Sequence, residues 1–167
     1  SSMGRLLDGI ASILDVCQYN SYEGEAAMKL EALARSCQQP VKEAYPLPLQ
    51  GGLLMLHELL NALLADQQKG VPGSRIAQKL FWSLAVAIRQ VSDQAGIRKL
   101  AFSGGVFQNA LLTDMIRAAC EDTKQLYHHR QLSPNDECIG LGQLAWYHLQ
   151  NRTANKVPRT KEAELIT

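Results

Sequence analysis

The chain has 167 residues, of which 46% are apolar and 20% are charged, and its formal net charge is +1. This length suits one domain, or two small lobes, with a buried core. The near-neutral charge gives no overall attraction to nucleic acid or to a membrane surface. No apolar run reaches the roughly 18 residues that a membrane span needs, and the N-terminus lacks the plan of a signal peptide. We therefore expect a globular cytoplasmic protein with no membrane or nucleic-acid partner.

Apolar periodicity predicts an α/β protein in which helices dominate and strands are few and short. The predicted elements, in chain order, are a helix over 3–16, a helix over 21–34 capped by Ser21, a connector over 40–50 with an edge strand at 44–49, a helix over 53–65, a helix over 72–92, a strand over 97–102, a helix over 108–120, a strand at 125–127 and a helix over 139–149. The polar tail over 151–167 has no apolar period, so we expect it to be disordered. The folded lobe is expected to occupy residues 1–150.

Cysteines and histidines form no complete metal site in the sequence. None of the four cysteines has a Cys-x-x-Cys partner, so zinc-finger spacing is absent. His128 and His129 are adjacent, so their rings cannot share one helix face. Cys17 and Cys120 lie in apolar helical patterns, which predicts buried thiols that stay reduced in the absence of an export signal.

The most informative segment is Ser103-Gly104-Gly105-Val106-Phe107-Gln108-Asn109, between a predicted strand and a predicted helix. A glycine turn in this place presents backbone N–H groups and a helix N-terminus, both of which suit a phosphate. The same pattern also occurs as a plain tight turn. The segment alone therefore leaves two interpretations, a nucleotide or acyl-phosphate site and a simple connection.

Other polar residues each have an ordinary structural interpretation. Asp8 is spaced for a surface ion pair with Arg5. Asn109 stands where a helix cap is expected, and Asp136 lies in a turn-forming Pro-Asn-Asp sequence. A solvated helix face explains the glutamates of the second helix, which are Glu23, Glu25 and Glu31. Spacing thus leads to a possible phosphate site and no further.

Four segments together resemble the C-terminal part of the HypF family, the carbamoyltransferases of nickel-iron hydrogenase maturation. The segments are residues 1–8, residues 22–31, residues 103–109, and Asn135-Asp136 followed by residues 140–143. A weaker related pattern occurs in the enzymes that place threonylcarbamoyl on tRNA adenosine. Both families have a two-lobed actin-like ATPase (ASKHA) fold. By this resemblance the chain is the second lobe, a small sheet packed by several long helices.

The resemblance implies a role for five residues in binding carbamoyl-adenylate. Asp8 and Gly24 would hold the sugar of the nucleotide. The turn at Gly104 and Gly105 would approach the phosphates. Asn109 would form a hydrogen bond with the adenylate or carbamoyl portion.

The resemblance also implies a metal ligand at Asp136, on a zinc or iron ion that contacts the acyl-phosphate end. The remaining ligands are expected on the first lobe, because this chain has no His-x-x-x-His pair. Where the family usually has two glycines after Asn-Asp, this chain has Glu137 and Cys138. An added carboxylate at that position can supply a ligand or repel a phosphate.

By the same resemblance, the whole enzyme makes carbamoyl-adenylate from carbamoyl phosphate and ATP. It then transfers the carbamoyl group to the C-terminal cysteine of a partner maturation protein. An isolated lobe holds half of an inter-lobe cleft, so we expect weak nucleotide binding at most and no turnover. Two alternatives are a non-catalytic module that docks a partner protein and the corresponding lobe of a tRNA threonylcarbamoyl-adenosine synthesis enzyme.

Overall fold

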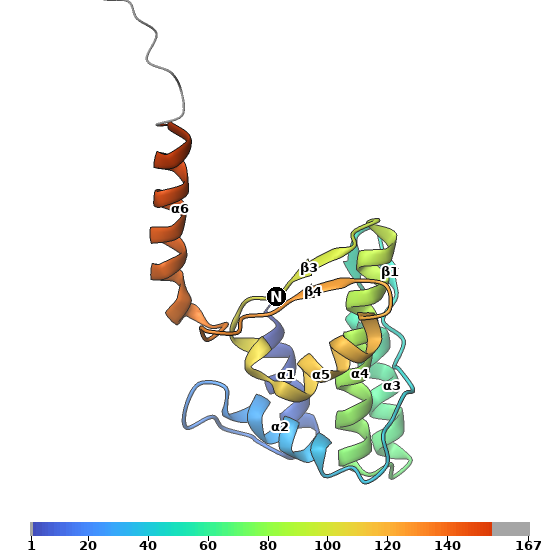
Figure 1. The fold of residues 1–167 in the computed structure, drawn as a ribbon. Helices are drawn as coiled ribbons and strands as arrows, with labels where there is room; N and C mark the ends of the chain where they lie inside the picture. Colours follow the sequence, from blue (N-terminus) through green and yellow to red (C-terminus); the bar gives the residue numbers. More distant parts are fainter. Residues whose placement is uncertain (1, 155–167) are drawn as a thin grey trace, which may run out of the picture.

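The computed structural model describes residues 2–154, and helices make up most of this range (Figure 1). The elements are α1 (Met3–Ile13), α2 (Glu25–Arg35), β1 (Leu49–Gln50), β2 (Leu53–Leu54), α3 (Leu56–Gln68), α4 (Gly73–Gln94), β3 (Lys99–Ala101), the 3-10 helix η1 (Gly105–Gln108), α5 (Ala110–Cys120), β4 (Gln125–Tyr127), the 3-10 helix η2 (Asp136–Cys138) and α6 (Ile139–Ala154). No helix among these is long and apolar enough to cross a membrane. The prediction of a mainly helical α/β lobe is confirmed.

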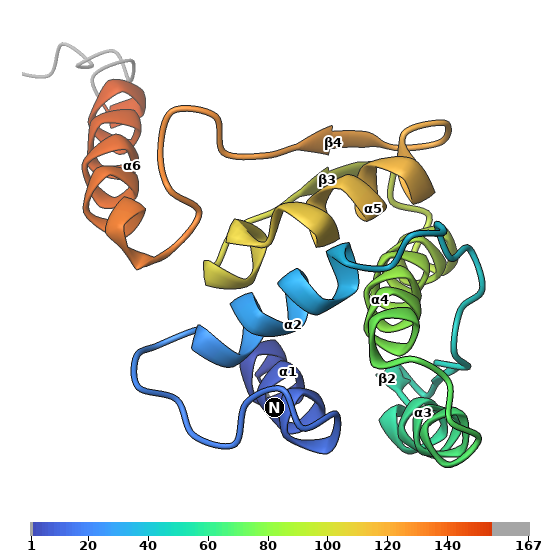
Figure 2. The ribbon, with the colours of Figure 1, turned by 90° about the horizontal axis from the view of Figure 1, so that it is seen from below.

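The core forms around α4, which packs against α2, α3 and α5, while α1 packs against α2 (Figure 2). Its largest fully buried side chains include Leu7, Ile10, Leu30, Leu80, Phe81 and Ile116. In each helix these residues recur at helical spacing, so one face is apolar and turns inward. Burying each such side chain stabilises the fold by about 1.5–3 kcal/mol. Cys17 and Cys120 are buried as predicted.

The strands form two separate pairs instead of one small sheet. β3 and β4 are parallel, with Leu100 opposite Leu126, and β1 and β2 form an antiparallel hairpin. The predicted edge strand at 44–49 is wrong except for its last residue. The reason is that the connector bonds to side chains of α4 and not to another strand. The Tyr45 N–H, within the segment, donates to Ser83 Oγ, and the Val41 N–H, just before it, donates to Gln78 Oε1, both at 2.7 Å.

The helices predicted from residues 53 and 108 begin later than their apolar patterns suggest. The helix predicted from residue 53 begins at Leu56, because Leu53 and Leu54 belong to the hairpin. The helix predicted from residue 108 begins at Ala110, because the tighter turn of η1 comes first. Both starts were displaced by a local turn that the apolar period does not detect.

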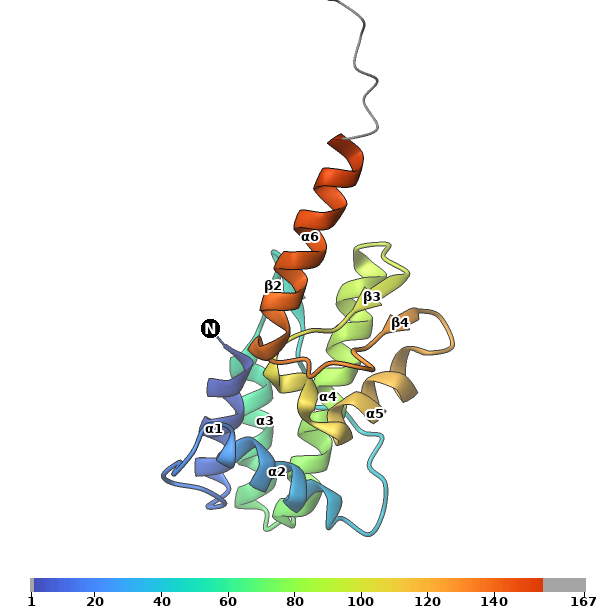
Figure 3. The same ribbon diagram turned by 60° about the vertical axis from the view of Figure 1, so that its left-hand side comes forward.

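α6 extends away from the rest of the molecule (Figures 1 and 3). Its large apolar side chains are exposed by half or more, among them Leu141, Leu144, Trp146 and Tyr147. The helix runs to Ala154, past the expected boundary of the lobe at residue 150. The rest of the predicted tail, residues 155–167, lies outside the described residues. The large apolar side chains of α6 therefore lie outside the core of the described chain.

Candidate functional site

The first turns of α2 and α5 lie at the same end of the molecule, next to the start of α6 (Figure 2). The predicted site residues fall into two groups there. Asp8 and Gly24 belong to α1 and the start of α2. Gly104, Gly105 and Asn109 belong to the turn before α5.

Asn20 connects Asp8 to the start of α2. Its Nδ2 donates to Asp8 Oδ1 at 3.4 Å, and its Oδ1 accepts from the Ala26 N–H at 3.0 Å. The predicted ion pair is present, because the Arg5 guanidinium lies 2.6 Å from Asp8 Oδ2. The buried Oδ2 is therefore held by this ion pair and has no further hydrogen-bond partner among the described residues.

α2 begins at Glu25, with Gly24 as its N-cap, and not at Ser21 as predicted. Gly24 has φ 83°, in the left-handed region, and no atom lies within 4 Å of where its Cβ would stand. Ser21 contributes differently: its N–H and its hydroxyl both donate to Glu25 Oε2 at 2.6 Å. The loop before α2 is thus held by the first residue of the helix, and Gly24 leaves open space beside it.

Glu25 is buried, so the solvated helix face predicted for it is wrong. Lys29 Nζ lies 2.7 Å from Glu25 Oε1. The hydrogen bond with Lys29, followed by the two from Ser21, lowers the pKa of Glu25 from 4.5 to about 2. Glu25 therefore remains ionised throughout the ordinary pH range.

Gly104 has a backbone conformation that favours glycine, with φ 110° and ψ 152°. Its N–H donates to the Pro134 carbonyl at 2.6 Å, which ties the turn to the loop before η2. This N–H is therefore used within the protein and is not presented to a phosphate. No atom lies within 4 Å of where a Gly104 Cβ would stand, so the turn is open on that side.

Asn109 caps α5, as its position predicted. Its Oδ1 accepts from the Leu112 N–H at 2.8 Å. The residue is only 8% exposed, and its buried Nδ2 has no hydrogen-bond partner among the described residues. A buried donor without a partner costs about 1–3 kcal/mol, and a ligand acceptor placed there would remove that cost.

Glu31 is a contributor to this end of the molecule that the sequence did not reveal. Its Oε1 accepts from the Leu111 N–H at 3.0 Å and from Arg35 Nε at 2.9 Å. The predicted solvated face is wrong for this residue too, since its side chain is 18% exposed. Glu31 and Leu111 are 80 residues apart, so only its place at the end of the 22–31 segment gave a signal.

Asp136 is exposed at the start of η2, where Asn135 Oδ1 accepts from the Glu137 N–H at 3.2 Å. No group of three or more histidine, cysteine, aspartate or glutamate side chains within residues 2–154 is arranged to hold a metal ion. One carboxylate does not make a metal site. The described residues therefore do not by themselves form a complete metal site.

The fold is a helical α/β lobe, and one end of it carries a glycine turn, the ion-paired carboxylate of Asp8 and the buried amide of Asn109, whose Nδ2 has no hydrogen-bond partner among the described residues. A family model described as "Carbamoyltransferase, Kae1-like Domain, second subdomain" matches residues 1–143. The chain belongs to this family, the HypF carbamoyltransferases.

Individual relatives agree with this assignment. The chain is 36% identical over 149 residues to carbamoyltransferase HypF of Synechocystis sp., covering 86% of this chain and 19% of the relative. It is 37% identical over 148 residues to that of Rhodobacter capsulatus, with the same coverage. The crystal structure of T. kodakarensis HypF matches with a TM-score of 0.77 at 32% identity, covering 90% of this chain and 20% of the other. A full-length HypF in the phosphate- and nucleotide-bound form matches with a TM-score of 0.73 at 28% identity, covering 86% of this chain and 23% of the other. The chain thus spans about a fifth of the length of these relatives.

Proposed function

We propose that this chain forms one side of a carbamoyl-adenylate site in a HypF-type carbamoyltransferase. One observation carries the proposal. Within residues 2–154, the buried side-chain polar atoms without a hydrogen-bond partner are Asp8 Oδ2, Asn109 Nδ2 and His128 Nε2. Two of the three belong to Asp8 and Asn109, which the family resemblance assigns to nucleotide binding. The Asn109 Nδ2 donor is thus unused, while Asp8 Oδ2 is ion-paired with Arg5, a partner that a ligand hydroxyl would join or replace.

Each of these two atoms suits the part of the nucleotide expected near it. A carboxylate oxygen accepts from sugar hydroxyl groups, which is the role proposed for Asp8 beside the open space at Gly24. An amide Nδ2 donates to carbonyl or phosphate oxygens, which is the role proposed for Asn109. The open side of the turn at Gly104 and Gly105 leaves room for the phosphates.

The chemistry proposed for the whole enzyme starts from ATP and carbamoyl phosphate and passes through carbamoyl-adenylate. The acceptor is the C-terminal cysteine of a partner maturation protein, whose thiolate attacks the carbamoyl carbon and releases adenylate. We assign no nucleophile or general base to the described residues. This lobe alone is expected to bind nucleotide weakly and to have no turnover, because the contacts of the first lobe are missing.

Asp136 is proposed as a single carboxylate ligand for a zinc or iron ion, with the other ligands on the first lobe. A bound ion would polarise the carbamoyl carbonyl and offset phosphate charge. Glu137, next in the chain, places a second carboxylate within the same 3-10 turn.

Calorimetric titration with ATP tests the proposal. Asn109→Ser keeps a side-chain acceptor for the Leu112 N–H but removes the Nδ2 donor. Asp8→Asn removes the carboxylate charge while keeping the size of the side chain. Asn61→Ser, an exposed change on α3, is the matched control.

We expect measurable ATP binding that Asn109→Ser and Asp8→Asn each weaken by about tenfold or more, equivalent to about 1.4 kcal/mol. Asn61→Ser should bind as the unmodified chain does. Equal binding by all four proteins would contradict the proposal. If the folded chain binds no ATP, the titration is repeated after the first lobe is added. ATP binding that then requires both Asn109 and Asp8 supports the proposed site. No ATP binding by the combined lobes rejects it.

A partner-docking role is favoured by a different observation, the exposed apolar side chains of α6. Leu144, Trp146 and Tyr147 are 66–70% exposed, and a second apolar surface, a groove of about 520 Å³, includes Leu100 and Phe107. Because the relatives are about five times as long as this chain, we propose that another part of such a protein covers α6. The alternative of a tRNA-modifying lobe is not retained, since the chain belongs to the HypF family.

Light scattering after size-exclusion chromatography tests the exposure of α6. The isolated chain is expected to self-associate with rising concentration, and Leu144→Glu should reduce that association. A monomer at high concentration, with added first lobe failing to bind α6, would contradict the docking role.

A further inference from the structure

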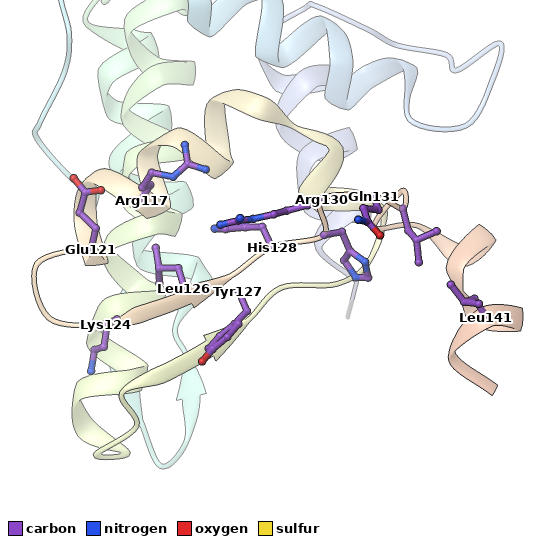
Figure 4. Close-up of a pocket in the computed structure, with 11 residues that line it drawn as sticks. Arg117, Glu121, Lys124, Leu126, Tyr127, His128, Arg130, Gln131 and Leu141 are labelled. Atoms are coloured by element: carbon purple, nitrogen blue, oxygen red, sulfur yellow. The ribbon is translucent and has the colours of Figure 1, made fainter. Parts of the chain in front are cut away.

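The third unpartnered buried atom, His128 Nε2, belongs to a pocket that the nucleotide site does not use. The pocket has a volume of about 890 Å³ and follows β4 between the second half of α5 and the loop after β4. Figure 4 shows Arg117 on α5, with His128 and Arg130 beside it and Leu141 of α6 at the far end. Arg117, Lys124 and Arg130 contribute positive charge, and Glu121 is the one acidic residue among those that line it.

The three cations of the pocket differ in how far they are already neutralised. Lys124 is only 5% exposed, and its Nζ lies 2.6 Å from Asp93 and donates to the Ile97 carbonyl at 2.8 Å. Arg117 has one contact, at 3.3 Å, with Asp114, and both side chains are more than half exposed. No acidic side chain within the described range is ion-paired with Arg130. Two guanidinium groups therefore retain unused donors.

His128 and His129, which also line the pocket, contact residues just before the glycine turn. The His128 ring stacks on Phe102, with centroids 4.8 Å apart and planes 12° apart. Burial, followed by the positive charge of Arg117, lowers the pKa of His128. His129 Nε2 lies 3.2 Å from Ser103 Oγ, in the turn that follows β3. The pocket thus adjoins the carboxyl ends of two parallel strands, where open α/β sheets bind ligands.

We propose that this pocket binds a phosphate group, held by the guanidinium groups of Arg117 and Arg130. A guanidinium presents paired N–H donors whose geometry matches the oxygens of a phosphate. The chain has a net charge of only +1, so the protein as a whole is not basic and the two arginines form a local positive patch. His128 is a further polar residue in the pocket lining, and its Nε2 has no hydrogen-bond partner among the described residues. The site is separate from Asn109 and does not rest on the proposed carbamoyl-adenylate site.

The test is a titration of the intact chain with inorganic phosphate, followed by the imidazole proton resonances of His128 and His129. Arg117→Gln and Arg130→Gln each remove one guanidinium. Arg75→Gln is the matched control, because Arg75 lies on α4 and pairs with Glu43 at 3.6 Å, outside the pocket. A thermal melt of each variant establishes that it is folded.

We expect phosphate to shift the His128 resonance and to raise the pH at which this ring titrates. Each pocket variant should weaken phosphate binding by about tenfold, equivalent to about 1.4 kcal/mol, while Arg75→Gln leaves it unchanged. Asn109→Ser should also leave it unchanged, so failure of the adenylate site and failure of this site are distinguishable. ATP competing with phosphate in wild type but not in Arg130→Gln would indicate a phosphate carried by a larger molecule.

Three results would overturn the proposal. One is no resonance shift with phosphate in the folded chain. Another is an equal loss in Arg75→Gln, which would mean general attraction between charges. The third is tight binding of a polyglutamate peptide that phosphate does not displace, which would make the pocket a site for acidic peptides.

Discussion

The starts of α2 and α5 lie at the same end of the molecule but use their polar groups in opposite ways (Figure 2). At the start of α2, the Glu25 carboxylate receives two hydrogen bonds from Ser21 and an ion pair from Lys29. At the start of α5, Asn109 uses its Oδ1 as a cap while its buried Nδ2 has no partner in the described structure. The Glu25 carboxylate thus has partners within its own region, whereas the Asn109 Nδ2 donor has none among the described residues.

This difference separates a structural role from a binding role at two similar places. Both regions contain a glycine with positive φ, Gly24 and Gly104, but a buried donor without a hydrogen-bond partner, which costs free energy, occurs only at the start of α5 among the two regions described. Such costs persist at sites where a ligand or a mechanism uses them. The Glu25 cluster has no comparable cost, so it serves to hold the loop beside Gly24.

The largest effect is expected at Gly104. Gly104→Ala should lower the free energy of unfolding by about 2–3 kcal/mol, because alanine rarely adopts φ 110°. Gly105→Ala is the matched control, since Gly105 has no positive φ and its Cβ would meet nothing closer than 4.0 Å. Urea unfolding of both variants gives the comparison. Equal stability of the two would show that the turn before α5 stores no strain.

The next effect is expected where Glu31 links the two regions. Glu31→Ala leaves the Leu111 N–H without its acceptor and should cost about 1–2 kcal/mol. Glu31→Gln keeps an acceptor oxygen and should cost less. Hydrogen exchange of the Leu111 amide checks the mechanism, since its protection should fall in the alanine variant. Unchanged protection would mean that α2 does not support the start of α5.

Local patterns predicted the parts of the fold that depend on short-range order. The helices, the strand at 125–127, the buried Cys17 and Cys120 and the cap at Asn109 all follow from apolar period or from capping chemistry. The edge strand predicted at 44–49 is wrong because the connector around it bonds to α4: Val41 donates to Gln78 and Tyr45 donates to Ser83, each more than 35 residues away. A period in the sequence carries no signal for such partners.

The candidate site divides in the same way. The glycine turn and the capping role of Asn109 were readable from neighbouring residues. The contact of Glu31 with Leu111 depends on which elements meet in space. So does the lack of a hydrogen-bond partner for Asp8 Oδ2 and Asn109 Nδ2 within the described residues. The glutamates of α2 were assigned to solvent because helical spacing does not say which face packs against α5.

A pH effect is expected at the start of α2. Because the pKa of Glu25 is lowered from 4.5 to about 2 in the folded protein, its ionised form stabilises the fold above about pH 4.5. That contribution is lost as the pH falls from 4.5 toward 2. Glu25→Gln should therefore show a shallower loss of stability over this range, and Ser21→Ala an intermediate one. An identical acid slope in all three proteins would mean that the cluster does not hold the loop.

The smallest effect is expected at Asn109, and it bears most directly on the comparison. Asn109→Ser retains the cap oxygen and should change the free energy of unfolding by no more than about 0.5 kcal/mol, whereas Asn109→Ala should cost about 1 kcal/mol. If the Nδ2 group had a structural partner, serine would be as damaging as alanine. A stable serine variant that also loses nucleotide binding would mean that the fold uses the oxygen of this amide and the ligand uses its nitrogen. The start of α5 would then differ from the start of α2 by one donor kept for a ligand.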